Sequence, residues 1–173
     1  MEIVADILKI TIPALLVLLM AWLILRNMIK NDQNKRRQEL LLQNNKTITP
    51  IRLQAYERIV LFLERISLES LIVRVSSSDM SASQLQAALL NTIRSEFEHN
   101  LSQQIYMSPQ AWEVVKNAKS NMIKTINNEV ENIPGKSTGM DLTKRLFDKI
   151  MKIDKEPTHV AIDFLKMEIA RIF

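Results

Sequence analysis

Residues 81–107 read SASQLQAALLNTIRSEFEHNLSQQIYM, and this stretch decides the fold. Apolar residues return at every fourth position, at Leu85, Leu89, Ile93, Phe97, Leu101 and Ile105. This spacing predicts a long α-helix with an apolar face, and the drift of that face around the axis predicts contact with more than one neighbour. Several N-cap candidates at residues 79–83 mark where the helix begins.

Helices are also predicted on the C-terminal side. Ser108 followed by Pro109 is a typical helix start, and the helix after it should pack antiparallel against the first as a hairpin. Its apolar face is Trp112, Val115, Ala118, Met122, Ile126 and Val130. A proline and both glycines of the chain make residues 133–139 a surface loop. Two short amphipathic helices follow, one at about 141–153 and one from Pro157 onward.

On the N-terminal side, residues 49–66 form another predicted helix. Thr49 can cap its free N–H groups, and Pro50 costs nothing at the first helical position. Residues 68–75 fit either a short helix or a strand, and we favour a helix because no partner strand is evident. Because apolar residues recur at three and four and only two glycines occur, residues 49–173 are predicted to be an all-α domain, a small helical bundle.

The N-terminus has a different composition. Residues 10–25 are sixteen residues without a charge, and basic residues follow at once. A helix of that length rises about 24 Å against a hydrocarbon core of about 30 Å, so residues 7–9 must help to fill it. We therefore expect a transmembrane anchor over residues 1–30. The span itself is represented by Ile10, Leu15, Leu19, Trp22 and Leu25.

Basic residues set the expected orientation. Arg26, Lys30, Lys35, Arg36 and Arg37 follow the apolar run, whereas two acids and one lysine precede it. Because the cytoplasmic flank of a span retains lysine and arginine, we expect the N-terminus outside and the helical domain in the cytoplasm. The location is then a bacterial inner membrane, crossed once. Residues 31–48 form a basic juxtamembrane linker, helical or frayed, that suits anionic lipid headgroups.

The net charge of +4 is unevenly distributed. Residues 26–52 hold seven lysines or arginines and two acids, whereas residues 53–173 hold fifteen bases and fifteen acids. A neutral domain argues against DNA binding. Contact between the basic linker and ribosomal RNA is a minor alternative that nothing else in the sequence supports.

No constellation of residues identifies a reaction. The chain has no cysteine, which excludes disulfides and thiol chemistry. No nucleophile, base and orienting acid can be nominated, so we expect no catalytic residue, no cofactor and no enzyme. Tyr106, Met107 and Trp112 cluster at a predicted helix junction, where an exposed aromatic anchor would suit a protein partner. The apolar C-terminal residue Phe173 is a further candidate contact.

A di-metal carboxylate site is the alternative from another functional class. Glu96 stands three residues before His99, and Glu156 stands three residues before His159. Ferritin-like proteins use such a pair from each of two helices and one carboxylate from each of two others. Those carboxylates would be Glu57 or Glu64 and Glu113 or Glu129. We assign no metal ligand, because Pro157 puts the second pair at a helix start and the first pair borders the core.

A family resemblance supports part of this interpretation. Residues Ile48 to Arg74, with Pro50, Arg52, Leu53, Gln54, Ala55, Tyr56, Glu57 and Arg58, resemble a group of small single-span proteins of Bacteroidetes-type bacteria. Glu96 to Tyr106 adds to the likeness, which covers most of the chain. The resemblance implies an uncharacterised family at the inner membrane, with no catalytic motif to transfer.

These observations lead to one main hypothesis about function. The chain would be a non-enzymatic, membrane-anchored adaptor, an accessory subunit of a larger integral membrane protein complex such as protein export or insertion machinery. Two alternatives stay open: a ferritin-like di-metal protein, and a binder of anionic lipid surfaces that depends on Lys35, Arg36 and Arg37.

Overall fold

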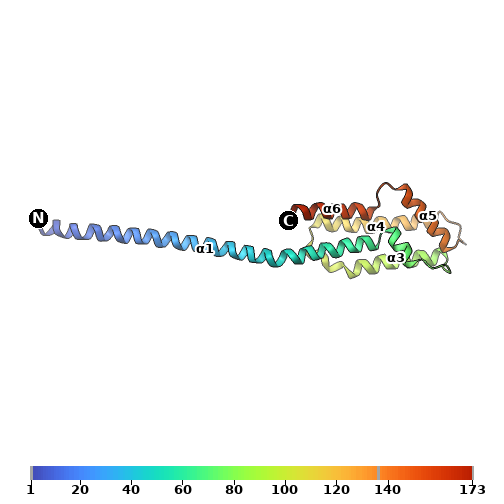
Figure 1. The fold of residues 1–173 in the computed structure, drawn as a ribbon, viewed down its shortest axis with the longest axis horizontal. Coiled ribbons are helices and arrows are strands. Elements are labelled where there is room, and N and C mark those ends of the chain that lie inside the picture. Colours follow the sequence, from blue (N-terminus) through green and yellow to red (C-terminus); the bar gives the residue numbers. More distant parts are fainter. Residues whose placement is uncertain (1, 136, 173) are drawn as a thin grey trace. The chain divides into compact units, whose positions relative to one another are not determined.

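The computed structural model describes residues 2–135 and 137–172 (Figure 1). Within them, the side chains of residues 2–14, 27, 29–34, 37–38, 40–45, 47 and 172 are outside the description. The elements are α1 (Glu2–Arg65), α2 (Leu68–Val75), α3 (Ala82–His99), the 3-10 helix η1 (Leu101–Tyr106), α4 (Pro109–Glu131), α5 (Gly139–Lys152) and α6 (Pro157–Ile172). The prediction of an all-α chain, including a helix at residues 68–75, is confirmed.

The chain divides into two compact units, residues 1–49 and 50–173. Among the described residues, no helix is long and apolar enough to cross a membrane. The predictions of a transmembrane span at residues 10–25 and of a single-pass inner-membrane location are therefore wrong. The physical reason is length, because a spanning helix needs about 20 consecutive apolar residues and the charge-free run here has sixteen, between Lys9 and Arg26.

The predicted helix start at Thr49 and Pro50 is wrong. α1 continues through Pro50 without a break, so the linker expected at residues 31–48 is helical. A proline inside a helix removes one hydrogen bond and costs about 3 kcal/mol. No glycine and no second proline lies between residues 14 and 65 to add to that cost. A single proline therefore does not end this helix, because the residues around it favour the helical conformation.

One hydrophobic core holds residues 50–173 together. α4 lies along both α6 and α3, and α5 packs against α2 and α3 (Figure 1). The largest fully buried side chains include Tyr56, Phe62, Leu68, Leu85, Leu89, Ile93 and Met122. Phe97 links α1 and α4 in this core, because its ring lies 5.9 Å from that of Phe62 and stacks at 5.4 Å on that of Trp112. The predicted inner faces of these helices are largely the buried ones.

The long helix predicted from Leu85 to Ile105 ends earlier. Asn100 follows α3, and its side-chain amide donates to the carbonyl oxygen of Glu96 at 2.8 Å. An asparagine side chain that bonds to the backbone competes with the helix ladder, and the chain continues as the 3-10 turn η1. Ile105 is consequently exposed rather than part of the core.

Two helix starts are joined to one another. Ser81 caps α3 and Thr138 caps α5, each in a reciprocal capping box. Ser81 and Thr138 also form an isolated antiparallel bridge, in which the Gly139 N–H donates to the Met80 carbonyl at 2.7 Å. A Cβ on Gly139 would lie 2.9 Å from that carbonyl oxygen. Glycine is therefore required by this close backbone approach.

Candidate functional site

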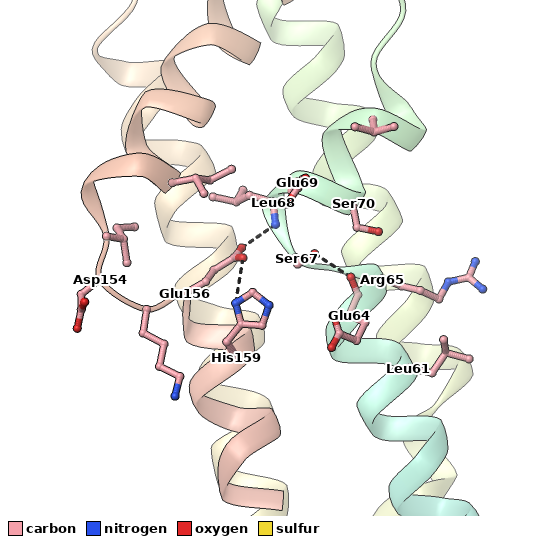
Figure 2. A pocket seen from close by; sticks show the side chains of 14 residues that line it. Leu61, Glu64, Arg65, Ser67, Leu68, Glu69, Ser70, Asp154, Glu156 and His159 are labelled. Carbon is pink, nitrogen blue, oxygen red and sulfur yellow. Dashed lines mark hydrogen bonds and ion pairs between the residues drawn. The ribbon is translucent and has the colours of Figure 1, made fainter. Parts of the chain in front are cut away.

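An open groove of about 840 Å³ lies beside the start of α2. The end of α1 and α2 form one wall, with Leu61, Glu64, Leu68, Glu69 and Val73. The end of α5, the following loop and the start of α6 form the other, with Ile150, Ile153, Asp154, Glu156 and His159. Figure 2 shows these two walls facing one another across the labelled side chains. The volume is within the usual range for ligand-binding clefts.

Glu156 connects the two walls at the base of the groove. Its Oε1 atom accepts a hydrogen bond of 2.6 Å from the Leu68 N–H (Figure 2). Leu68 is the first residue of α2, and the N-cap residue Ser67 makes no side-chain cap bond. The carboxylate therefore satisfies an N–H group that no earlier turn of the helix can reach. A residue 88 positions away in sequence thus caps α2.

The surroundings of Glu156 disfavour its charge. The residue is 8% exposed, and its Oε2 atom lies 3.9 Å from His159 Nδ1. Burial raises the pKa of the Glu156 carboxyl above its usual value; the Leu68 N–H and His159 lower it, and the nearby carboxylates of Glu69 and Glu64 raise it. Desolvation and the neighbouring like charges therefore both raise the pKa of this buried acid.

The charge balance of the groove is negative. Its walls carry four acids, Glu64, Glu69, Asp154 and Glu156, and two basic residues, Arg65 and Lys155. Both basic residues are paired with acids outside the groove: Arg65 contacts Glu96 at 2.8 Å, and Lys155 contacts Asp163. In Figure 2 the Arg65 side chain extends away from Glu156. Glu64, Glu69 and Asp154 have no ion-pair partner among the described residues.

The same groove exposes apolar side chains. Leu61 is 57% exposed and Val73 is 74% exposed, although the helix that carries Val73 buries Leu68, Leu71 and Ile72. Exposed aliphatic residues that line a concavity are characteristic of contact surfaces. The groove thus combines apolar walls with three carboxylates, those of Glu64, Glu69 and Asp154, that are not ion-paired within the part of the chain that the structure describes.

The three residues of the predicted aromatic anchor, Tyr106, Met107 and Trp112, differ in burial. Trp112 and Met107 are buried, and Trp112 stacks on Phe97 as part of the core. Tyr106 is 40% exposed, and its backbone carbonyl accepts a hydrogen bond of 3.2 Å from Arg52 Nε. Phe173 lies outside the described residues. Of the four candidates, only Tyr106 offers a described side chain to a partner.

The two Glu–His pairs are not brought together as a metal site. The Glu96 carboxylate is bound by Arg65 at 2.8 Å and by Arg74 at 3.4 Å. Glu156 is occupied by the Leu68 N–H. In the part of the chain that the structure describes, no three His, Cys, Asp or Glu side chains are grouped to hold an ion.

The predicted N-terminal site residues lie along α1. Leu15, Leu19, Trp22 and Leu25 are exposed, and Arg26 lies over the Trp22 ring at 5.2 Å. Lys35 and Arg36 are exposed too. The side chains of Ile10, Lys30 and Arg37 lie outside the described residues. These residues form an apolar stretch followed by a basic one.

A family model matches residues 2–172, nearly the whole chain. The chain belongs to a family of unknown function, DUF7935. The resemblance to an uncharacterised family is thereby confirmed, whereas its bacterial origin and single-span nature gain no support. No curated protein and no solved structure matches this DUF7935 chain. Its function therefore has to be argued from the groove and the charge distribution.

Sequence reasoning missed the groove in this DUF7935 member. The sequence pattern gives Glu64 and Glu156 a role only as metal ligands, and it gives Leu61 and Val73 none. One signal was available, because Glu156 directly precedes Pro157, which places its carboxyl at a helix start. The contact with Leu68 could not be read from the sequence, since it joins segments far apart in the chain.

Proposed function

We propose that this DUF7935 chain is a non-enzymatic adaptor whose helical domain, residues 50–173, docks a helix of a partner protein in the groove. The observation that carries the proposal is the exposure of Leu61 and Val73 beside uncompensated acids. An amphipathic helix with basic residues next to its apolar face matches that surface in shape and charge. Glu156 favours docking over acid–base chemistry, because its carboxylate already caps α2.

A second contact surface fits the same proposal. The large apolar side chains at residues 15–20 and 22–25 are exposed on the described part of α1. A helix that is apolar on every side is normally covered by other protein or lipid. An adaptor needs two contact surfaces, and this stretch is the second one we propose. Protein export or insertion machinery is the larger assembly to examine first.

Binding of model helices tests the proposal. Three peptides of equal length and equal apolar face, one basic, one neutral and one acidic, are titrated into the full-length chain and followed by fluorescence anisotropy. We expect the basic peptide to bind most tightly and its affinity to fall with added salt, because the charges are at the rim. Equal binding of all three peptides, or none, would contradict the proposal.

Matched variants assign the binding to the groove. Leu61→Ser and Val73→Ser remove exposed apolar side chains from its walls, and we expect each to weaken binding of the basic peptide. Val160→Ser is the control, because Val160 is a similarly exposed aliphatic residue on α6 outside the groove. If the control loses as much affinity for the basic peptide as the groove variants do, the binding is nonspecific hydrophobic adsorption and does not occur in the groove.

Binding to anionic lipid headgroups is a second candidate function. It is favoured by the exposure of Lys35, Arg36 and Lys46 on α1, in the segment that holds all the excess positive charge. Vesicles with and without anionic lipid separate the two functions. Binding to anionic vesicles that disappears when Lys35, Arg36 and Arg37 become glutamine supports this one.

A further inference from the structure

We infer that the helix docked in the groove is residues 35–48 of a second copy of this chain. This inference rests on the proposed function of the groove and names its occupant. The argument has three parts: the charge that the groove lacks, the apolar contact it offers, and a segment of the same sequence that supplies both.

The groove requires positive charge at its rim. Arg65 and Lys155 are paired with Glu96 and Asp163 outside it, so neither neutralises Glu64, Glu69 or Asp154. The carboxylates of Glu64 and Glu69 also act on buried Glu156 as like charges, and His159 acts on it in the opposite direction. A basic residue entering from another chain would meet several carboxylates, while the two basic residues of the lining, Arg65 and Lys155, are held by Glu96 and Asp163.

The groove also requires apolar side chains close to those charges. Leu61 and Val73 are exposed, while Ile150 and Ile153 contribute partly buried surface from the opposite wall. A docking helix must therefore present leucine-like residues within one turn of its basic residues. Partner helices that bind in grooves have this pattern of anchors three and four residues apart.

Residues 35–48 of α1 have the required pattern. They read KRRQELLLQNNKTI, with four basic residues, one acid and three consecutive leucines. Arg36 and Leu40, like Arg37 and Leu41, are four residues apart, so on a helix each arginine lies one turn before a leucine. The described side chains of Lys35, Arg36, Lys46 and Ile48 are all exposed.

We take a second copy, rather than the same one, as the source of the segment, and the experiments below mix two distinguishable copies to test this choice. Two copies can exchange the contact reciprocally, since each has one groove and one segment, and such a self-complementary interface closes into a dimer.

Cysteine cross-linking tests this arrangement, since the chain has no cysteine of its own. One full-length variant carries Val73→Cys in the groove wall, and the other carries Leu41→Cys in the basic segment, with tags of different size. We expect mild oxidation of the mixture to give a disulfide-linked heterodimer. Val160→Cys replaces Val73→Cys in the control, and we expect no heterodimer there. Equal cross-linking of the control overturns the inference.

Charge reversal supplies a second readout that does not depend on cysteine. We expect Glu69→Lys with Asp154→Lys to lower the yield of the heterodimer on the order of tenfold at low salt. Reversal of the segment, Lys35→Glu with Arg36→Glu, should lower it similarly, and the two reversals combined should restore it. A combined variant that stays uncross-linked overturns the inference.

A peptide of residues 33–48 separates this inference from the proposed function. Full-length chain is titrated with this peptide and with an unrelated basic amphipathic helix. Binding of both, abolished by Val73→Ser, supports the inference. If only the unrelated helix binds, the second copy is not the occupant and the proposed docking function stands. If neither binds, the docking function itself fails.

Discussion

The contact between Glu156 and Leu68 makes one prediction that can be worked out in detail. Glu156→Ala removes the hydrogen-bond partner that the buried Leu68 N–H has among the described residues, at the start of α2. Leaving a buried donor unsatisfied costs about 1–3 kcal/mol. We therefore expect the free energy of unfolding at pH 7 to fall by about that amount. Glu156→Gln keeps a side-chain oxygen that accepts the same bond, and it removes a buried charge beside Glu64 and Glu69.

The pH dependence separates these two effects. Because the pKa of Glu156 is raised in the folded chain, its contribution to stability is complete below the unfolded value near 4.5 and is lost as the pH rises through the folded pKa. Glutamine does not titrate. The free energy of unfolding of Glu156→Gln, relative to that of the natural chain, should therefore rise from pH 4 to pH 7. His159 lies beside position 156 in the natural chain and is unchanged in the variant.

Urea unfolding followed by far-ultraviolet circular dichroism at both pH values measures the difference. Glu98→Gln, at an exposed position of α3, is the matched control for loss of a surface carboxylate. If Glu156→Gln destabilises as strongly as Glu156→Ala at pH 7, or if its relative stability is highest in acid, then the explanation of Glu156 as a buried, charge-disfavoured cap is refuted.

Three further predictions concern stability and are checked by the same unfolding measurement. Thr158→Val should stabilise the chain by about 1 kcal/mol, because the buried Thr158 hydroxyl has no hydrogen-bond partner among the described residues; a loss of stability would reveal a bond to that hydroxyl. Gly139→Ala should destabilise the chain by about 1–3 kcal/mol, because the new Cβ would lie 2.9 Å from the Met80 carbonyl oxygen. An unchanged urea midpoint would mean that the backbone at the Ser81–Thr138 bridge can shift at little cost. Trp112→Ala should cost about 3–5 kcal/mol, whereas Tyr106→Ala at its exposed position should change stability by less than about 1 kcal/mol; equal losses would contradict their different burial.

Helix positions in the domain could be predicted well from the sequence. Local signals were sufficient where a cap and an apolar repeat agreed, as at Ser108 and Pro109, where the Ser108 hydroxyl accepts from the Ala111 N–H at 3.0 Å. Gly139 was expected in a loop, and the structure places it at the first position of α5. Such boundaries depend on hydrogen bonds to residues distant in sequence, which a local pattern does not contain.

Three predictions failed for different physical reasons. The start at Pro50 failed because a single proline does not outweigh a long stretch of helix formers around it. The continuation of α3 to Ile105 failed because the Asn100 side chain competes for the carbonyl of Glu96. The membrane span failed because a charge-free run of sixteen residues is shorter than the roughly 20 apolar residues that a spanning helix needs, and no helix among the described residues is long and apolar enough.

The candidate site was the least predictable part. The groove exists because the turn after α1 lies against the loop between α5 and α6, and Glu156 bonds Leu68 across 88 positions of sequence. Each wall taken alone looks like the solvent-facing side of an ordinary amphipathic helix. Only the fold shows that Leu61 and Val73 face a concavity with uncompensated acids.

The antiparallel bridge between Ser81 and Thr138 has a consequence for sequence variation. The turns that precede α3 and α5 end in the caps Ser81 and Thr138, and backbone hydrogen bonds hold the two caps at a fixed offset. A residue inserted in one turn would move its cap away from the other. Relatives of this chain should therefore lengthen or shorten these two turns in concert, or keep both at constant length.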